Sequence, residues 1–102
     1  MALWPGMSED IPFIDSKFEL GFLGMTPGVK AEIDIQEIIN AVRRHAQCDW
    51  GEVGQEDAEA NNWSLENEAR LLSVYQSSAR VKFYIITEAD RSATTVLLPS
   101  EY

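Results

Sequence analysis

The hydrophobic positions between Asp34 and Ala46 follow a helical period. They are spaced i, i+3, i+4 and i+7 along one face: Ile35, Ile38, Ile39 and Val42. Asp34 is suited to cap the first turn, and Glu37 three residues later completes a capping-box pair. We therefore predict a helix over residues 34–46, with the basic residues 43–45 in its last turn, where they complement the helix dipole.

Alternation of apolar and polar residues predicts strands near residues 18–23 and over 70–76 and 81–87, with turns at "SSAR" and "EADRSA". The β-branched residues of 94–99, a stretch that ends at Pro99, predict a fourth strand. The last three strands have short connections, which is typical of an antiparallel meander. Between the first strand and the meander, "TPG" predicts a short helix capped by Thr26, and the composition of residues 55–67 favours a further helix.

This order predicts an α+β fold. A small antiparallel sheet (β-α-α-β-β-β, with a C-terminal three-strand meander) would have helices packed on one face. We expect an irregular N-terminal arm at residues 1–16, which contains Pro5 and Pro12, and a single α+β domain at 17–102. The apolar arm residues could dock on the core or on a second copy of the chain: Trp4, Ile11, Phe13 and Ile14.

The net charge says more about possible binding partners than the overall composition does. The 102 residues carry 17 acids and 8 bases, a formal net charge of −9. Direct nucleic-acid binding is not expected, because binding to phosphates requires clustered Lys and Arg, and anionic membranes are disfavoured for the same reason. Seven acids and no base lie between residues 49 and 68: Asp49, Glu52, Glu56, Asp57, Glu59, Glu66 and Glu68. A basic protein is the partner that this charge would attract, although it could also serve solubility alone.

Other bulk features indicate a cytoplasmic protein. No apolar run approaches the roughly 20 residues of a membrane span, and the first residues do not have the pattern of a secretory signal. The single cysteine, Cys48, cannot form an internal disulfide, which favours a reducing compartment. The edges of the predicted sheet, together with the apolar arm, are compatible with a homodimer.

Searches for catalytic and metal-binding patterns give weak candidates. His45, Cys48 and Asp49 are close enough to suggest zinc, but a second Cys or His is missing nearby. There is no GxSxG elbow and no phosphate-binding glycine motif. We therefore predict no catalytic residue, no metal and no cofactor, and we expect that the protein is not an enzyme.

The turn at residues 88–91 and the tryptophans Trp50 and Trp63 each allow a structural and a binding role. Glu88 and Asp90 flank a turn beside Arg91, where an ionic staple of the hairpin tip and a ligand site are both compatible with the residues. Trp50 in its loop is better suited to filling the core than to binding a ligand. Beside the acids, however, Trp50 and Trp63 could also anchor a basic partner.

Several segments resemble a known family. They are "FELG", "TPG", "RRH" followed by "CDWG", then "RLLSVY" and the long "ITEADRSATTVLLPSEY". Over roughly its last five-sixths the chain is similar to the uncharacterised small "plasmid-related protein" family, encoded on plasmids and integrative mobile elements of proteobacteria. Members usually have glycine where Cys48 stands, which argues against a catalytic or metal role for this cysteine.

The resemblance implies a mobile-element context and points to particular positions. These are His45, Asp49, Trp50, Asp57, Asn61, Arg70, Tyr75, Glu88, Asp90 and Arg91. Our first hypothesis is a non-enzymatic accessory protein that binds another protein, with acidic DNA mimicry against a host nuclease or restriction system as a sharper version. The alternative is a small-ligand or enzymatic site around Trp50, His45 and the Glu88/Asp90/Arg91 turn. Asp49, Asp57 and Asn61 could also meet Arg70 or Arg91 in a network that pins the helices to the hairpin.

Overall fold

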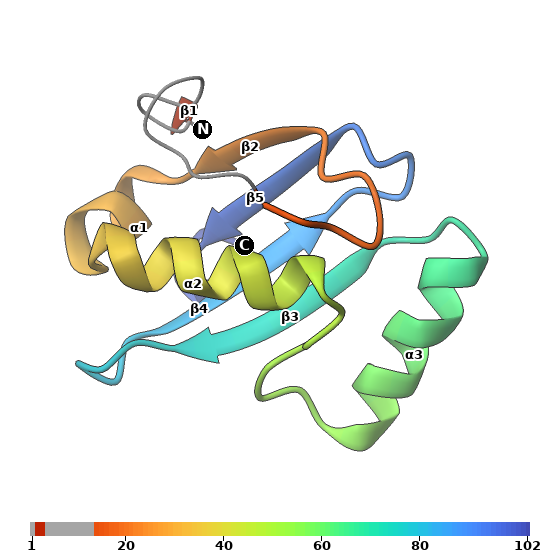
Figure 1. Ribbon diagram of the computed structural model, residues 1–102. Coiled ribbons are helices and arrows are strands. Elements are labelled where there is room, and N and C mark those ends of the chain that lie inside the picture. The colour runs from red at the N-terminus through yellow and green to blue at the C-terminus, as the bar shows by residue number, and fades with distance from the viewer. Residues whose placement is uncertain (1, 4–13) are drawn as a thin grey trace.

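The computed structural model describes residues 2–3 and 14–102 (Figure 1). Its elements are β1 (Ala2–Leu3), β2 (Phe22–Met25), α1 (Pro27–Glu32), α2 (Ile35–Ala46), α3 (Gln55–Glu66), β3 (Leu71–Gln76), β4 (Lys82–Thr87), β5 (Ala93–Leu97) and the short 3₁₀ helix η1 (Pro99–Glu101). Of the N-terminal arm predicted from the sequence, Trp4, Ile11 and Phe13 lie outside the described residues. Ile14 packs against the core.

The described strands form one mixed sheet in the order β1-β2-β5-β4-β3. The β3-β4-β5 meander is antiparallel, and the α+β class is confirmed. The sheet is not wholly antiparallel, because β2 runs parallel to β5 with Phe22 opposite Ala93 and Met25 opposite Val96. Short turns impose antiparallel pairing within the meander, whereas β2 and β5 are separated by helices that leave their relative direction free.

The N-terminal caps of the first two helices form where the sequence places them. The Thr26 hydroxyl accepts a hydrogen bond from the Val29 amide (3.4 Å), and Pro27 occupies the first turn of α1. The Asp34 carboxylate accepts from the Gln36 amide (2.8 Å) at the start of α2. Each cap satisfies an amide that would otherwise have no partner within its helix.

The capping box predicted for Asp34 and Glu37 does not form. The Glu37 carboxylate instead accepts a hydrogen bond from the backbone amide of Ser78 (2.7 Å), in the turn between β3 and β4. A partner 41 residues away in the chain has replaced the local one, and Glu37 therefore links α2 to the hairpin.

The first strand of the domain begins later than the alternation near residues 18–23 predicts. Gly21 has a φ of +66°, a left-handed conformation that interrupts the extended chain before β2. A Cβ atom at this position would lie 2.3 Å from the Ser92 backbone, so only glycine allows β2 to start beside β5. Phe18 consequently lies outside the sheet, and its ring packs against His45.

The core lies between the sheet and helices α1 and α2, which cover one of its faces (Figure 1). The helices contribute mainly aliphatic residues, and alternate strand positions supply the facing layer. The fully buried side chains include Val29, Ile38 and Val42 from the helices, and Leu71, Phe83, Ile85 and Val96 from the strands. In the part of the chain that the structure describes, no helix is long and apolar enough to cross a membrane.

Helix α3 and the loop before it occupy the outer edge of β3. The Asn61 side chain donates to the Leu72 carbonyl (2.7 Å) and accepts from the Leu72 amide (3.0 Å). Two residues after Leu72, the backbone of Val74 binds the loop before α3. The Val74 amide donates to the Trp50 carbonyl (3.1 Å), and the Val74 carbonyl accepts from the Glu52 amide (2.6 Å). An edge strand usually presents these groups to other chains, so β3 has no free backbone edge at these positions for a second copy.

We expect Gly51→Ala to disrupt this edge. Gly51 bridges to Val74 with a φ of +73°, and an added Cβ would lie 2.0 Å from the Val74 carbonyl oxygen. The strained φ and the clash together predict a loss of roughly 3 kcal/mol in the free energy of unfolding, measured by urea denaturation. The matched control is Gly54→Ala, where an added Cβ has no atom within 4 Å. Its loss should stay below about 1 kcal/mol, as expected for an N-cap substitution from Gly to Ala. Equal losses in the two variants would contradict this account.

Candidate functional site

His45, the only histidine of the chain, lies at the centre of a buried polar network. Its Nδ1 lies 2.6 Å from the Ser73 hydroxyl and its Nε2 2.8 Å from the Thr87 hydroxyl. The Thr87 hydroxyl is 2.8 Å from that of Thr94, which donates to the Leu20 carbonyl (2.7 Å). All four side chains have 0% exposure. The network therefore runs from α2 through β3, β4 and β5 to the segment before β2.

The carbonyl at one end fixes the direction of every hydrogen bond in this chain. Thr94 donates its one proton to the Leu20 carbonyl, so Thr87 must donate to Thr94. Thr87 then accepts from His45, which places the imidazole proton on Nε2 and leaves Nδ1 to accept from Ser73. Burial, with a smaller contribution from the charge of Arg91, lowers the pKa of His45 to about 3. His45 is thus neutral, with both nitrogens engaged.

Trp50 fills the core beside this histidine. Its side chain is 6% exposed, and its ring meets the His45 ring edge to face at 5.7 Å. Its indole N–H donates to the Asn62 side chain of α3 (3.1 Å). The half-buried Phe18 ring lies against both, 5.4 Å from His45 and 6.3 Å from Trp50. A buried and hydrogen-bonded Trp50 has no surface for a ligand or a partner.

The zinc arrangement considered from the spacing of His45, Cys48 and Asp49 does not form. Both His45 nitrogens have hydroxyl partners, and Asp49 is paired with Arg44. Within the described ranges, no group of three or more His, Cys, Asp or Glu residues is placed to hold a metal. Burial raises the pKa of the Cys48 thiol, which disfavours the thiolate that a ligand or nucleophile needs.

Cys48 has a backbone role at the end of α2. Its φ of +64° lies in the left-handed region, and its amide donates to the His45 carbonyl (3.0 Å). The next amide, that of Asp49, donates to the Arg44 carbonyl (2.9 Å). These two bonds form a Schellman motif, in which the position of Cys48 favours glycine.

Asp49 and Arg44 form an ion pair in front of Tyr75. Arg44 Nε donates to Asp49 Oδ2 (2.7 Å) and Nη2 donates to Oδ1 (3.3 Å). The guanidinium also lies 4.8 Å above the centre of the Tyr75 ring, and the Tyr75 hydroxyl donates to the Asp49 carbonyl. The bond from Arg44 is the main reason why the pKa of Asp49 is lowered. This cluster holds the loop after α2 against β3.

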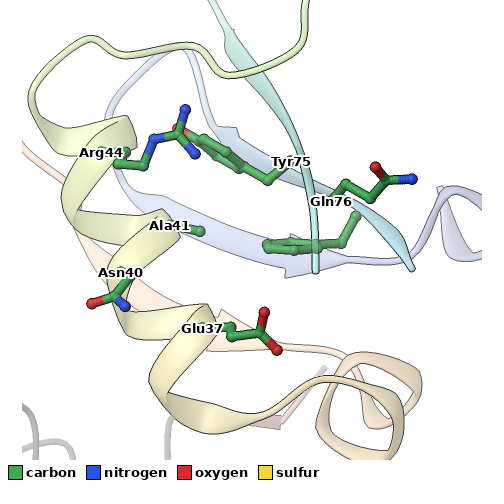
Figure 2. A pocket seen from close by; sticks show the side chains of 7 residues that line it. Glu37, Asn40, Ala41, Arg44, Tyr75 and Gln76 are labelled. Carbon is green, nitrogen blue, oxygen red and sulfur yellow. The ribbon is translucent and has the colours of Figure 1, made fainter. Parts of the chain in front are cut away.

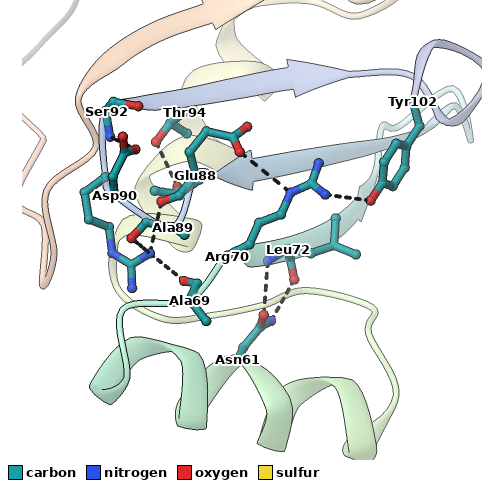
Figure 3. Close-up of polar contacts among 12 residues, drawn as sticks. Asn61, Ala69, Arg70, Leu72, Glu88, Ala89, Asp90, Ser92, Thr94 and Tyr102 are labelled. Carbon is teal, nitrogen blue, oxygen red and sulfur yellow. Dashed lines mark hydrogen bonds and ion pairs between the residues drawn. The ribbon is translucent and has the colours of Figure 1, made fainter.

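The carboxylates of the β4–β5 turn do not pair with Arg91. Asp90 accepts from the Ser92 amide (3.0 Å). The Ser92 side chain, followed by this amide, lowers the pKa of Asp90. Glu88 lies 4.0 Å from Arg70, the residue just before β3 (Figure 3). The ionic staple between these acids and Arg91, considered as one reading of the sequence, is therefore absent.

Arg91 binds backbone carbonyls instead. Its guanidinium donates to the carbonyls of Ala69 (2.6 Å), Glu88 (3.1 Å), Ala89 (3.4 Å) and Ser64 (3.1 Å). Ser64 and Ala69 belong to the end of α3 and the segment that follows it, so Arg91 fastens this helix to the turn. The network expected from the sequence, in which Asp49, Asp57 and Asn61 meet Arg70 or Arg91, does not form. Asp49 pairs with Arg44 and Asn61 binds the backbone of Leu72, whereas Arg91 joins helix and hairpin through carbonyls.

Arg70, Glu88 and Tyr102 form a second cluster, shown in Figure 3. Arg70 donates to the Tyr102 hydroxyl (3.0 Å), and its guanidinium lies 5.2 Å from the centre of that ring. The Glu101 carboxylate accepts from the Thr26 hydroxyl (2.5 Å) and the Gly28 amide (3.2 Å), which lowers its pKa. The C-terminus is thereby tied to the start of α1.

The sequence-predicted site residues do not share one cavity. Asp90 and Arg91 line a shallow depression with Glu68 and Ala89, but His45 and Trp50 are not part of its lining. Arg91 approaches the His45 cluster only through Phe18, with its guanidinium 5.9 Å from that ring. Most of these residues make structural contacts. The sequence reading also missed the inward-facing hydroxyls of Ser73, Thr87 and Thr94, whose signal was a polar residue at a core-facing strand position.

The outward face of α3 carries a cluster of acidic side chains around an exposed tryptophan. The helix buries only Asn61 and Ser64. Its opposite face presents Trp63, which is 61% exposed, with Glu56, Glu59 and Glu66 at positions −7, −4 and +3 relative to it. These spacings place all four side chains on one side of the helix. None of the three glutamates forms an ion pair with a described base. Asp57, another residue singled out from the sequence, is exposed but lies outside this face. It stands four residues before Asn61 and seven before Ser64, so it shares their side of the helix.

Comparison of the chain with protein-family models, curated protein sequences and solved structures returned no match.

We expect the buried histidine to make stability depend on pH. Because the pKa of His45 is about 3 in the folded protein and near 6.5 when unfolded, the unfolded state binds an extra proton as pH falls below 6.5. Stability should therefore decline toward pH 3, by about 1.4 kcal/mol per pH unit once pH is well below 6.5. In urea denaturation, the wild-type protein should lose about 1.6 kcal/mol more than His45→Gln between pH 6.5 and 5. Parallel losses would assign the pH dependence to other groups.

Two arginines in left-handed conformations offer a matched comparison. Arg80 (φ +65°) and Arg91 (φ +61°) each follow a turn closed by a bond to the carbonyl three residues earlier. The Arg80 side chain has no hydrogen bond or ion pair to the described residues, so Arg80→Gly should stabilise the protein by about 1 kcal/mol. Arg91→Gly should destabilise it by roughly 2 kcal/mol, because the loss of its carbonyl bonds exceeds the relief of strain. Thermal unfolding measures both; shifts of the same sign would refute the role given to Arg91.

Proposed function

We propose that this chain is a non-enzymatic protein-binding module whose recognition surface is the outward face of α3. The observation that carries this proposal is the exposure of Trp63 among Glu56, Glu59 and Glu66, on a helix whose inner face is already occupied by the edge of β3. Large aromatic residues are frequent binding hot spots, especially when other residues around them exclude water.

The partner that fits this face is a basic protein segment. A Lys or Arg side chain can lie over the face of Trp63, and its neighbours can pair with the flanking glutamates. The net charge of −9 would accelerate the encounter with a positively charged partner, and this steering would weaken as salt increases.

A sharper form of the proposal is DNA mimicry. Glutamates at intervals of three and seven residues form a row of negative charges roughly 5 and 10 Å apart along the helix. This row is sparser than that of one DNA strand, which carries a phosphate about every 3.4 Å, but it has the same sign and a similar linear arrangement. A host nuclease or restriction protein would then bind α3 with the surface that normally binds DNA. A cytoplasmic location, the context of a mobile element, and the absence of any membrane or cofactor requirement belong to this same proposal.

The test uses the wild-type chain and two triple variants as immobilised baits. Glu56→Gln/Glu59→Gln/Glu66→Gln removes the charge of the α3 face. Glu19→Gln/Glu32→Gln/Glu52→Gln removes the same charge from other exposed positions. Basic proteins captured from a proteobacterial lysate by the wild type should be retained by the second variant and lost by the first. Trp63→Ala should weaken binding of each purified protein at least about tenfold.

Two outcomes would contradict the proposal. Equal loss on both triple variants would show attraction by net charge alone, and binding that does not weaken between 0.01 and 0.15 M salt would exclude exposed charge pairs, since the screening length falls from about 30 to 8 Å over this range. Duplex DNA should compete with the chain for the purified partner if mimicry is correct, and failure to compete would leave protein binding without mimicry.

A further inference from the structure

A small hollow lies between α2 and the β3–β4 hairpin, and no residue of α3 lines it. Its volume is about 160 Å³, and its lining includes Glu37, Ala41 and Arg44 from the helix. Tyr75 and Phe83, paired across the two strands with ring centres 5.8 Å apart, supply the aromatic side. In Figure 2, the side chains of Glu37 and Arg44 extend from α2 toward the strands, with the short Ala41 side chain between them.

The hollow exists because Ala41 contributes only a methyl group. It lies four residues after Glu37 and three before Arg44, so the three residues share one helix face. A longer side chain at this position would occupy the space between the two charges. With about 30 Å³ for each liquid water, the hollow has the volume of roughly five waters, well below the range of about 300–1,000 Å³ for drug-sized ligands.

The two charged residues retain unused hydrogen-bonding capacity. Arg44 binds Asp49 through Nε and Nη2, which leaves both Nη1 protons without a partner among the described residues. The bond from the Ser78 amide occupies Glu37 Oε1 and leaves Oε2 without one. These existing bonds hold both side chains in position, so a ligand would meet an already ordered cation and an already ordered anion.

The spacing of the two charges selects the ligand. Seven residues of helix separate Glu37 from Arg44 by about 10 Å along the axis. The ammonium and carboxylate of an ordinary α-amino acid are attached to one carbon and are too close together to reach both residues. A ligand with the two charges at opposite ends of an extended aliphatic chain would reach both and place its methylene groups over the aromatic rings.

We propose that this hollow binds an ω-amino carboxylate, such as free lysine or a lysine at the C-terminus of a polypeptide. The ligand carboxylate accepts from Arg44 Nη1, and its ω-ammonium donates to Glu37 Oε2. The aliphatic stem covers Tyr75 and Phe83. The two ends together carry no net charge, and the additional α-ammonium of free lysine makes it a cation, so the negative charge of the chain repels neither form of the ligand.

The test follows backbone amide resonances by NMR during titration with 6-aminohexanoate. Saturable shifts are expected near Ala41, Gln76 and Ser78. Hexanoate and hexylammonium each lack one charge and should bind at least about tenfold more weakly. Glu37→Gln keeps an oxygen for the Ser78 amide but removes the charge, and should weaken binding of 6-aminohexanoate by a similar factor. Glu59→Gln on α3 is the matched control and should leave the affinity unchanged.

Two further probes distinguish the sources of the ligand. L-Lysine and a short peptide ending in lysine with a free carboxylate are compared with the same peptide as its C-terminal amide. Stronger binding of the free-acid peptide than of lysine would indicate a polypeptide end, whereas the reverse would indicate the free amino acid. The proposal is overturned if 6-aminohexanoate produces no saturable shift, if hexanoate or hexylammonium binds equally well, or if Glu37→Gln has no effect. Because Glu59 belongs to the α3 face and does not line the hollow, a negative result in this titration leaves the proposal for α3 unaffected.

Discussion

The fold depends on one buried chain of hydrogen bonds that has His45 at its centre. Ser73, Thr87 and Thr94 come from three adjacent strands, and Leu20 from the segment before β2, so a single network fixes α2 and four other parts of the chain. A shift of one residue in strand register would turn these hydroxyls to the other face of the sheet. Buried polar groups are costly when unpaired, and in the described residues no buried side-chain nitrogen or oxygen lacks a partner. The network therefore disfavours every register except this one.

Helix α3 is held in a different way, by polar side chains bound to backbone. Asn61 pairs with the edge of β3, and Arg91 binds the Ser64 carbonyl near the end of the helix. The two residues that α3 buries, Asn61 and Ser64, are both polar, and the attachment of the helix does not depend on the side chains of its outward face. Trp63 and its acidic neighbours consequently have no structural role that would explain them, whereas Trp50, the other tryptophan considered from the sequence, is accounted for by the core.

Contacts between residues close together in the chain could be predicted from the sequence, whereas contacts between residues far apart in the chain could not. The caps at Thr26 and Asp34 were predictable because each depends on neighbours within three residues. His45 binds Ser73 and Thr87, which are 28 and 42 positions away in the chain. Glu37 binds Ser78, which is 41 positions away. No local sequence pattern indicates partners at these separations. The parallel pairing of β2 with β5 was missed for the same reason. Arg91 was identified as important, but its preference for carbonyls over adjacent carboxylates depends on where α3 ends.

The positions of the bases explain why so much negative charge remains exposed. The chain has eight bases and 17 acids, and three of the bases make contacts within the fold. Arg44 pairs with Asp49, Arg70 binds Glu88 and Tyr102, and Arg91 is surrounded by carbonyls. The contact of Arg91 with the end of α3 is to backbone, and it brings no cation to the outward glutamates. The stabilising arginines thus leave the charge of the α3 face uncompensated. A surface of this kind attracts a basic partner at long range while contributing little to the stability of the free protein.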